Sequence, residues 1–315
     1  MNTSKINDQS VILKIFNDCD FLLGLKLNRN NFPGPQPVAI EKKDIESLKK
    51  NKYVVCEKSD GERYILIILK EHTIFINRNN EFFNIKINID QEILGEGSIF
   101  DGEMITNNKD EKVYLIHDCM AYNGTNFIKK SHNLRYGAIM DFLTKRYIPN
   151  EINELNNNLN NLIIKTKIFY HYTSDLEKTW EHIQSVSENK IDGLIFTPIY
   201  AQIEFGRQLN LFKWKNGGNH TIDLLVKIIN NKIHTYYSNN KIFKKINNTD
   251  SEYTKIIKFT TKESLLKGII IEFNYIQEIL IPYRIRNDKI LPNSKLTVDN
   301  TLKNIKESLE IQDLC

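Results

Sequence analysis

Between residues 53 and 83 the chain alternates short apolar runs with polar turns, a pattern typical of consecutive β-strands. The runs are rich in β-branched and aromatic residues, which pack well on a pleated, half-buried surface. They cover residues 53–56, 64–69 and 73–77, and two more runs of the same kind follow at 98–105 and 113–120. This part of the chain therefore predicts a region built on β-sheet.

Two segments that flank these strands place apolar side chains at helical spacing, residues 8–28 and 131–148. Between the first helix and the strands, residues 32–38 contain three prolines within five positions. Proline fixes one backbone angle and cannot donate a backbone hydrogen bond, so this segment must be a rigid, non-helical connection. Strands and helices together predict an α+β first domain.

A second structural region follows Asn216-Gly217-Gly218-Asn219, in which two glycines stand between turn-prone residues. Beyond this boundary, short strands are expected at 224–229, 232–237, 242–246 and 268–273, and a last helix at 299–311. Short strands at this density suit a small barrel, of which the OB-fold is one form. We expect a first domain at 1–218, a barrel at 219–298, and a C-terminal helix at 299–315 that packs back on the first domain.

The composition excludes several classes of protein. Hydrophobic residues make up 41% of the 315 residues, which is enough to bury a core and too much for a disordered chain. The longest apolar run, residues 64–69, is far shorter than the roughly 20 residues of a membrane span, and residues 1–5 do not resemble a secretory signal. The 4 cysteines lack zinc-ligand spacing, so we expect a reducing compartment. The net charge of +4 permits a polyanionic partner without requiring one.

The first candidate site is the segment 57–63, Glu-Lys-Ser-Asp-Gly-Glu-Arg. Lys58 leaves a strand, Gly61 turns the chain, and Arg63 follows. A lysine attacks as a nucleophile only when its amine is neutral, which requires desolvation or nearby positive charge. Asp-Gly is also a common hairpin turn, so a charged hairpin is the alternative interpretation, and the segment alone leaves both open.

Four further segments carry charge in patterns that suit phosphate and metal chemistry. In Phe100–Met104, Asp101 and Glu103 straddle a glycine and share one face of a strand. The other three are an acidic residue that opens an apolar strand, two alternating lysines and an alternating basic segment, at 192–198, 211–215 and 284–289. Taken alone, each has an ordinary explanation as a hairpin turn or a solvated charged strand.

In this order, the segments resemble the motifs of the covalent nucleotidyltransferase superfamily, which contains messenger-RNA capping enzymes and polynucleotide ligases. The matching motifs are Lys58-Ser59-Asp60-Gly61 with Arg63, Phe100-Asp101-Gly102-Glu103, Tyr114-Leu115-Ile116-His117-Asp118, Asp192-Gly193-Leu194-Ile195-Phe196 and Leu211-Phe212-Lys213-Trp214-Lys215. The proline-rich segment 32–38 and the segment 284–293 are similar to the capping branch. The resemblance implies a nucleotidyltransferase domain of antiparallel sheets flanked by helices, followed by an OB-fold barrel and a C-terminal helix.

The resemblance further implies an mRNA guanylyltransferase that works in two steps. Lys58 would attack the α-phosphorus of GTP, release pyrophosphate and carry the GMP as a lysyl-GMP intermediate. The 5′-diphosphate end of an RNA would then take the GMP to form the GpppN cap. The alternatives are an ATP-dependent RNA or DNA ligase with the same lysine chemistry, and an inactive relative that binds RNA through its barrel.

The resemblance also implies a role for each motif residue. Glu103 and Asp192 would hold Mg²⁺ or Mn²⁺, since magnesium binds through few carboxylates together with substrate phosphates. The residues that bind GTP and its phosphates would be Arg63, Arg78, His117, Lys213, Lys215, Arg284, Arg286, Asp288 and Lys289. The further motif residues are Asp60, Gly61, Asp101, Asp118 and Asp223, the last of them near the hinge. Because the segment 284–289 lies in the second domain, step one requires the domains to close and step two requires them to open.

His117 stands where many relatives carry a phenylalanine that stacks on the guanine. An imidazole ring can stack too, and a buried, hydrogen-bonded histidine is the other interpretation, so the sequence leaves both open. No triphosphatase or methyltransferase motif is evident, and we expect these activities in separate partner proteins, with RNA polymerase as a further partner. The expected location is the nucleus, or the virion or cytoplasmic virus factory for a viral enzyme.

Overall fold

The structure is a computed structural model that describes residues 4–89, 97–148, 162–216, 220–287 and 289–315. The chain divides into two compact units. Unit 1 contains residues 1–38, 43–214 and 314–315, and unit 2 contains residues 39–42 and 215–313. The boundary expected at 218 and 219 lies outside the described residues, so the exact domain border remains a prediction.

The larger sheet of unit 1 has eight strands in the order β1-β6-β5-β4-β7-β8-β10, with β9 paired to β8. Its neighbouring strands are antiparallel except for β10, which runs parallel to β8. The strands are β1 (Ser4–Ile6), β4 (Glu62–Ile68), β5 (Thr73–Asn77), β6 (Phe82–Asn84), β7 (Ser98–Thr106), β8 (Lys112–Tyr122), β9 (Thr125–Asn126) and β10 (Ile163–Thr166). The strands expected at 64–69, 73–77, 98–105 and 113–120 are therefore confirmed.

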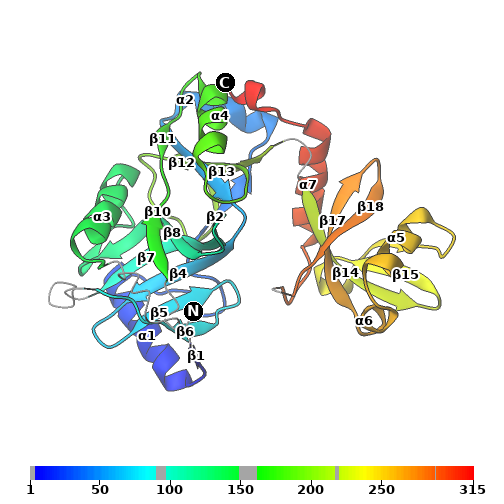
Figure 1. The fold of residues 1–315 in the computed structure, drawn as a ribbon, viewed down its shortest axis with the longest axis horizontal. Helices are drawn as coiled ribbons and strands as arrows, with labels where there is room; N and C mark the ends of the chain where they lie inside the picture. The colour runs from blue at the N-terminus through cyan, green and yellow to red at the C-terminus, as the bar shows by residue number, and fades with distance from the viewer. Residues whose placement is uncertain (1–3, 90–96, 149–161, 217–219, 288) are drawn as a thin grey trace. The chain divides into compact units, whose positions relative to one another are not determined.

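Two helices pack on this sheet, α1 (Gln9–Leu23) and α3 (His132–Lys145) (Figure 1). The side chain of Asp8 caps the start of α1 by accepting a hydrogen bond from the Ser10 backbone N–H at 2.8 Å. Gly24 ends the helix in the left-handed conformation, with φ at 60°, which glycine adopts without strain. The helix expected over 8–28 is therefore present but ends at Leu23.

Both faces of the larger sheet are covered, which accounts for the unbroken apolar run in β4. Ile65 and Ile67 belong to the core cluster that contains the buried face of α1. Leu66 and Ile68 point the other way and belong to the cluster that contains the buried face of α3. An antiparallel strand that is buried on both faces has no polar side to alternate with.

The smaller sheet of unit 1 has the strand order β11-β3-β12-β13-β2. Its strands are β2 (Pro35–Ala39), β3 (Tyr53–Ser59), β11 (Tyr170–His171), β12 (Ile191–Pro198) and β13 (Gly206–Lys215), and the helices of this region are α2 (Ile45–Lys50) and α4 (Leu176–Val186). Trp180 of α4 packs edge to face on Trp214 of β13, with ring centroids 5.5 Å apart. This contact fixes which face of β13 is buried.

Unit 2 is built on a five-stranded antiparallel sheet in the order β16-β15-β14-β17-β18. Its elements are β14 (Thr221–Ile229), β15 (Lys232–Tyr236), β16 (Ile242–Ile246), α5 (Ser251–Phe259), α6 (Lys262–Lys267), β17 (Ile269–Ile276), β18 (Ile279–Ile285) and α7 (Lys295–Glu307). This strand order, with helices between the third and fourth strands, is that of the OB-fold, a five-stranded, partly open barrel.

The C-terminal helix belongs to unit 2. Val298 of α7 is fully buried in the core of this unit, with Leu224 and Phe273 among its neighbours in the cluster. Only Leu314 and Cys315 belong to unit 1, where the Tyr172 hydroxyl donates a hydrogen bond to the Leu314 carbonyl at 2.6 Å. The helix is thus assigned to unit 2 and residues 314–315 to unit 1, and the packing of residues 299–315 on the first domain remains a prediction.

All 4 cysteines are free thiols, and Cys19, Cys56 and Cys119 are buried. Burial raises the pKa of the Cys19 and Cys56 thiols to about 12, so both stay protonated and unreactive at neutral pH. Among the described residues, no helix has the length and hydropathy that crossing a membrane requires.

Candidate active site

Lys58 and Asp192 meet on two paired strands of the smaller sheet. The register of β3 and β12 pairs Ser59 with Ile191 and Lys58 with Gly193, so Asp192 is the extra residue of a β-bulge. A bulge re-aims a side chain that regular alternation would point elsewhere. Lys58 Nζ donates a hydrogen bond to Asp192 Oδ1 at 2.6 Å, with side chains that are 21% and 19% exposed. The amine is thus held in place while it stays accessible.

Residues 60 and 61 carry the chain from one sheet to the other. β3 lies in the smaller sheet and β4 in the larger one. A Cβ atom on Gly61 would stand 2.4 Å from the Met104 carbonyl oxygen, closer than real Cβ contacts allow. The Asp60 backbone N–H donates to the Lys190 carbonyl at 3.0 Å, which fixes the crossing. The charged hairpin considered for residues 57–63 is therefore wrong, and glycine is required here by close approach.

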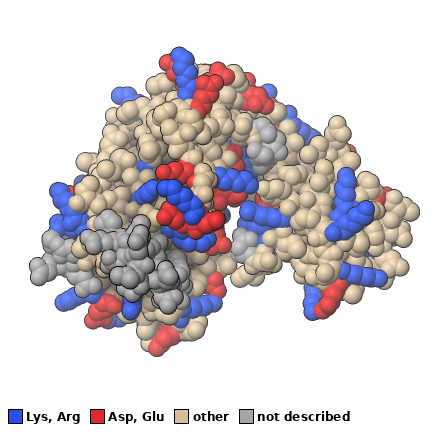
Figure 2. Space-filling view, viewed as in Figure 1, with Lys and Arg blue, Asp and Glu red and all other residues tan. Residues whose placement is uncertain are grey.

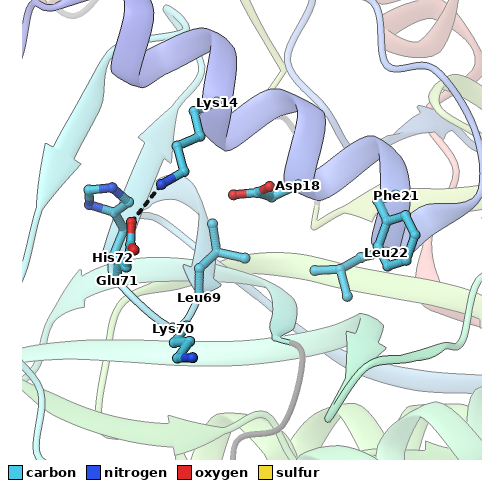
Figure 3. A pocket seen from close by; sticks show the side chains of 8 residues that line it. All are labelled: Lys14, Asp18, Phe21, Leu22, Leu69, Lys70, Glu71 and His72. Atoms are coloured by element: carbon cyan, nitrogen blue, oxygen red, sulfur yellow. Dashed lines mark hydrogen bonds and ion pairs between the residues drawn. The ribbon is translucent and has the colours of Figure 1, made fainter.

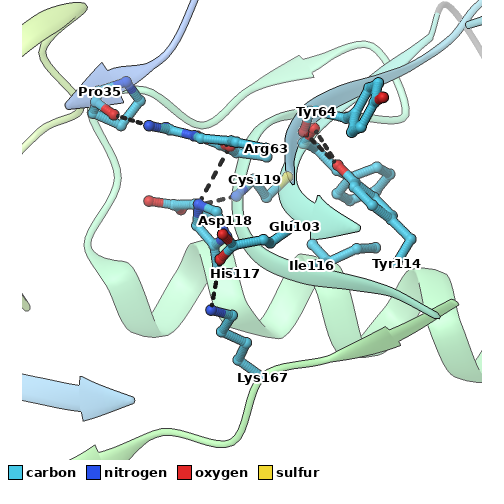
Figure 4. Close-up of polar contacts among 12 residues, drawn as sticks. Pro35, Arg63, Tyr64, Glu103, Tyr114, Ile116, His117, Asp118, Cys119 and Lys167 are labelled. Carbon is cyan, nitrogen blue, oxygen red and sulfur yellow. Dashed lines mark hydrogen bonds and ion pairs between the residues drawn. The ribbon is translucent and has the colours of Figure 1, made fainter. Parts of the chain in front are cut away.

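Arg63 is buried, with 7% of its surface exposed. Its Nε donates to Asp101 Oδ1 at 2.8 Å, and a second guanidinium nitrogen pairs with the other oxygen of the same carboxylate. A third nitrogen donates to the Pro35 carbonyl (Figure 4), and the guanidinium lies 5.0 Å from the centre of the Phe32 ring. The side chain therefore ties β4 and β7 to the proline-rich segment. The resemblance implies that Arg63 contacts the ribose and phosphates directly. Its burial and its pairing with Asp101 instead favour a positioning role.

The Asp101 carboxylate is ionised in this setting. Its complete burial opposes the charge, but Arg63 and then His117 outweigh that effect and hold the pKa well below its usual range. Asp101 and Glu103 lie on β7, where Glu103 is opposite Arg63 in the register with β4. Between them, a Cβ atom on Gly102 would lie 2.5 Å from the Tyr114 ring, so this glycine is also a site of close approach. The hairpin turn considered for Phe100–Met104 is wrong, because the segment lies within one strand.

Glu103 shares its environment with several cations. Lys167, just beyond β10, lies with Nζ 3.3 Å from Glu103 Oε2 and is almost fully buried. Burial would raise the pKa of Glu103, but Lys167 and His117, followed by Lys58 and Arg78, lower it. Because Lys58 and Arg78 both act on Glu103, the nucleophile candidate, this carboxylate and the exposed Arg78 side chain share one electrostatic site.

His117 is also the extra residue of a β-bulge. The register of β7 and β8 pairs Asp101 with Asp118 and Gly102 with Ile116, which leaves His117 without a partner residue. Its Nε2 lies 3.3 Å from Asp101 Oδ1, and the side chain is 24% exposed. Its Nδ1 is buried and has no hydrogen-bond partner among the described residues. The ring is therefore only half satisfied, which does not match a fully hydrogen-bonded core histidine.

Asp118 has a structural environment. Its carboxylate accepts hydrogen bonds from Arg135 Nε of α3 at 2.6 Å and from the Cys119 backbone N–H at 2.8 Å. Arg135 is buried and also donates to the Lys130 and Ala201 carbonyls. This pair fastens α3 to β8, one residue beyond His117.

Lys213 and Lys215 lie on β13, next to β12 in the smaller sheet. Both are half-buried, and Trp214 between them faces the opposite side, into the contact with Trp180. Lys58, Asp192 and the two lysines thus come from three adjacent strands of one sheet. Figure 2 shows basic and acidic side chains gathered together on the visible face of unit 1.

Unit 2 contains a second cluster of its own. Asp223 of β14 and Glu272 of β17 are paired residues and are both buried. Arg286 Nη1 donates to Asp223 Oδ1 at 3.1 Å and to Glu272 Oε2 at 3.4 Å, and Arg284 Nε donates to Glu272 Oε2 at 2.6 Å. Lys289 Nζ pairs with Asp223. Three cations and two carboxylates thus form one network among the described residues, and Asp288 lies outside them.

Three charged residues of these clusters were not predicted from the sequence: Lys167, Arg135 and Glu272. Each contributes a charge that only the folded chain brings to its partner. In the sequence, the one available signal is a charged residue next to apolar ones, as with Glu272 after three isoleucines. Such a residue needs a partner when buried, but the signal does not identify that partner.

A surface pocket of about 250 Å³ between α1 and the turn from β4 to β5 is separate from these clusters (Figure 3). Lys14 and Glu71 form an ion pair of 2.6 Å in its wall, and Phe21 and Leu22 line its other end. None of the predicted site residues lines this pocket.

Glu103 and Asp192 supply carboxylate oxygens, the ligands that a hard divalent cation prefers. Among the described residues, no three His, Cys, Asp or Glu side chains form a ready-made metal site. Magnesium binds through one or two carboxylates and completes its shell with water and substrate phosphates. Two carboxylates beside Lys58 therefore fit Mg²⁺ or Mn²⁺ bound together with a nucleotide.

Comparison with known proteins gives matches over both units. The family model of the mRNA capping enzyme catalytic domain matches residues 4–217, and that of the mRNA capping enzyme C-terminal domain matches residues 201–315. The mRNA-capping enzyme of Caenorhabditis elegans is 30% identical over 64% of this chain and 34% of the relative. The mRNA-capping enzyme of Danio rerio is 26% identical over 85% and 46%, and the mRNA-capping enzyme subunit alpha of Kluyveromyces lactis is 30% identical over 67% and 51%.

The chain spans about a third to a half of the length of these relatives. Among solved structures, a mycobacterial DNA ligase D complexed with ATP and MES aligns over 84% of this chain and 97% of its own, with 11% identity and a TM-score of 0.47. Similarity this low transfers no activity.

Proposed function

Because the chain belongs to the mRNA capping enzyme family, we propose that it is a GTP:RNA guanylyltransferase. The resemblance predicted from the motifs is thereby confirmed at the level of the family. The enzyme would transfer GMP from GTP to Lys58 and then to the 5′-diphosphate end of RNA, forming the GpppN cap. The observation that carries this proposal is the accessible Lys58 amine, held 2.6 Å from the bulge carboxylate of Asp192 beside two further lysines.

In the first step the neutral Lys58 amine attacks the α-phosphorus through Nζ, the bond from that phosphorus to the oxygen bridging to the β-phosphate breaks, and pyrophosphate leaves. Asp192 orients the amine, since a fixed nucleophile removes much of the entropic barrier. Lys213 and Lys215 favour the neutral form of the amine through their own charge, and they neutralise charge on the α-phosphate oxygens. A divalent ion held by Glu103 and Asp192 would add positive charge at the phosphates.

The buried pairs have positioning roles in this proposal. Arg63 and Asp101 hold β4, β7 and the proline-rich segment together, and Asp118 with Arg135 fastens the strand that carries His117. Arg78 and the half-satisfied His117 remain the residues of unit 1 proposed to contact the nucleotide. Asp60 and Gly61 set the crossing that leads the chain away from Lys58.

The cluster in unit 2 would bind the leaving phosphates. Arg284, Arg286 and Lys289 are held by two buried carboxylates, so their side chains are ordered before any ligand binds. Cations that are already ordered can bind a polyphosphate at low entropic cost. The order of events stays as the resemblance implies, with unit 2 engaged for the first step and withdrawn for the second.

We further propose that RNA triphosphatase and cap methyltransferase are separate proteins that act before and after this enzyme, and that RNA polymerase is a further partner. The proposed location is the nucleus, or the virion or cytoplasmic factory for a viral chain.

The test is covalent labelling. The protein is incubated with α-labelled GTP, and separately with α-labelled ATP, in Mg²⁺ or Mn²⁺, and the denatured chain is analysed for label and for the labelled residue. We expect label from GTP on Lys58, and none in Lys58→Ala or Lys58→Arg, because a guanidinium is not a usable nucleophile. Lys49→Arg on the exposed face of α2 is the matched control and keeps full labelling. Label from ATP alone would favour the ligase alternative, and no label from either nucleotide would favour the inactive relative.

A further inference from the structure

The outer face of three strands of unit 2 combines basic, aromatic and aliphatic side chains. Residues alternate along these strands between the core, which takes Val226, Ile233 and Ile246, and the outside. The outward residues, here called the β14–β16 face, are Leu225, Lys227, Ile229, Lys232, His234, Tyr236, Ile242 and Lys245. None of these residues is acidic, and Asp223 follows them on the same side of β14.

Two of the three lysines of this face lie in one row across the sheet, on either side of His234. The registers place Lys227 opposite His234 and His234 opposite Lys245. Burial, then Lys245 and Lys232, lower the pKa of His234, which keeps this ring neutral and places both lysines near it. None of the three lysines is ion-paired with a carboxylate of the described residues. Their charge is therefore available to an anion.

The same face also carries aromatic and aliphatic side chains. The rings of His234 and Tyr236 lie two residues apart on β15, with planes 22° apart and centroids separated by 6.2 Å. In the registers Tyr236 lies between Leu225 of β14 and Ile242 of β16, and Ile242 is 46% exposed. Near-parallel rings on a strand, bordered by lysines, form a surface on which nucleic acid bases stack while the phosphates meet the charges.

The face continues toward the ion-pair cluster of unit 2. Along β14, Lys227 and Leu225 are followed by Asp223, which belongs to that cluster. Four residues of strand span about 13 Å, the length of a few nucleotides of extended chain. The β14–β16 face and the proposed phosphate-binding cluster are thus two parts of one strand surface. On the side of unit 2 visible in Figure 2, the coloured side chains are mostly Lys and Arg.

We propose that the β14–β16 face binds single-stranded RNA, the segment that follows the 5′ end of the acceptor. Lys227, Lys232 and Lys245 contact phosphates, and His234 and Tyr236 stack on bases. This role deepens the proposed function, on which the identity of the RNA as the acceptor rests. In duplex RNA the bases are paired and stacked inside the helix, so they cannot stack on His234 and Tyr236. An acidic peptide could bind the lysines but has no bases to stack on these rings.

The first experiment measures binding of a fluorescein-labelled single-stranded 12-nucleotide RNA to the full-length protein by anisotropy, without GTP. His234→Ala with Tyr236→Ala is expected to weaken binding by about tenfold or more, since each base–ring contact contributes substantially to affinity. Tyr236→Phe keeps the ring and is expected to bind as the unmodified protein does.

The second experiment tests the charges through salt dependence. Replacing Lys227, Lys232 and Lys245 by Gln should lower the slope of log affinity against log salt by about 2, because each contact to a single strand contributes roughly 0.7. The matched control replaces Lys255, Lys258 and Lys262, three exposed lysines of α5 and α6, by Gln and should leave the slope unchanged. Equal losses in both triple variants, unchanged binding in the first, or equal competition by poly-glutamate would overturn the proposal.

Labelling of Lys58 by GTP separates this proposal from the proposed function. Every variant of the face should form lysyl-GMP at the normal rate, since this step takes place without RNA. Transfer to a long 5′-diphosphate RNA should need a higher RNA concentration, while transfer to a 5′-diphosphate dinucleotide should not change. If the unmodified protein forms no lysyl-GMP, the proposed function fails while the binding measurements still decide on the face.

Discussion

Asp192 and His117 each occupy the extra position of a β-bulge, so both depart from the regular alternation of a strand. The sequence predicted both as site residues, because their motifs were present. It did not predict the bulges, since a bulge is defined by the pairing of two strands that are far apart in the chain. Lys167 and Arg135, the partners of Glu103 and Asp118, were missed for the same reason. Arg63 was expected at the phosphates, and its burial beside Phe32 could be known only from the fold.

At this scale, Asp192→Asn tests the orienting carboxylate. The variant keeps the size of the side chain and removes the charge that holds the Lys58 amine. We expect lysyl-GMP formation to slow by roughly 100-fold or more. Quench-flow labelling with GTP measures the rate, and Asp175→Asn at the exposed start of α4 serves as the control. An unchanged rate in Asp192→Asn would remove Asp192 from the mechanism.

The buried pair of Arg63 and Asp101 leads to a pH-dependent prediction. Asp101→Asn leaves the guanidinium buried without a counter-charge, which should lower the free energy of unfolding by about 3–5 kcal/mol at pH 7. The folded-state pKa of Asp101 lies below its unfolded value, so its stabilisation is present above about pH 4 and is lost as the pH falls further.

Urea denaturation at a series of pH values measures this effect. The difference between the unmodified protein and Asp101→Asn should be constant near neutral pH and shrink in acid below about pH 4. A difference that grows in acid would contradict the assigned direction of the pKa.

At the scale of elements, strands were predicted well because β-branched runs between turns depend on local sequence alone. Sheet membership was not, since β3 and β4 follow each other in the chain and pair in different sheets. The Asp-Gly dipeptide at 60–61 predicts a hairpin by local rules. In the fold it connects two sheets, and Gly61 allows the close approach to the Met104 carbonyl. The end of α1 was set by Gly24, which stands inside the range expected for the helix.

The crossing at Gly61 predicts a large difference between two glycine substitutions. Gly61→Ala places a methyl group 2.4 Å from a backbone oxygen, which should destabilise unit 1 by about 1–3 kcal/mol or more. Gly137→Ala in α3 meets no atom within 4 Å and should be neutral or stabilise the protein by up to about 1 kcal/mol. Thermal denaturation of both variants measures the difference, and equal melting temperatures would show that the crossing can relax.

At the scale of the whole molecule, the order of the motifs predicted two units in the right sequence, with the OB-fold second. Glu272 was not predicted, because it follows three isoleucines on β17 and joins the charged cluster only through the pairing of β17 with β14, which places it opposite Asp223. The assignment of residues 39–42 to unit 2 also could not be predicted, because it depends on contacts with α7 more than 250 residues away, such as the 265-residue separation of Lys42 and Glu307.

Glu272→Gln tests whether the cluster of unit 2 serves the first step. The variant keeps the shape of the side chain and removes a charge that orients Arg284 and Arg286. We expect kcat/KM for lysyl-GMP formation to fall about tenfold, mainly through KM for GTP, while the melting temperature changes little. Glu263→Gln on exposed α6 is the control. If kinetics and stability fall together in Glu272→Gln, the carboxylate serves the fold of unit 2 alone.

The backbone passes between the two units four times, after residues 38, 42, 214 and 313. Lys303 pairs with Glu41, and the Lys42 backbone N–H donates to Glu307 at 3.0 Å, so a short N-terminal stretch is fastened to the last helix. A protease nick anywhere in 217–219 would accordingly yield two fragments that co-migrate on gel filtration and separate only in denaturant. In recombinant halves divided at that point, unit 2 would lack residues 39–42 and unit 1 would lack residues 314–315. The two halves should therefore fold better when co-expressed than when produced singly.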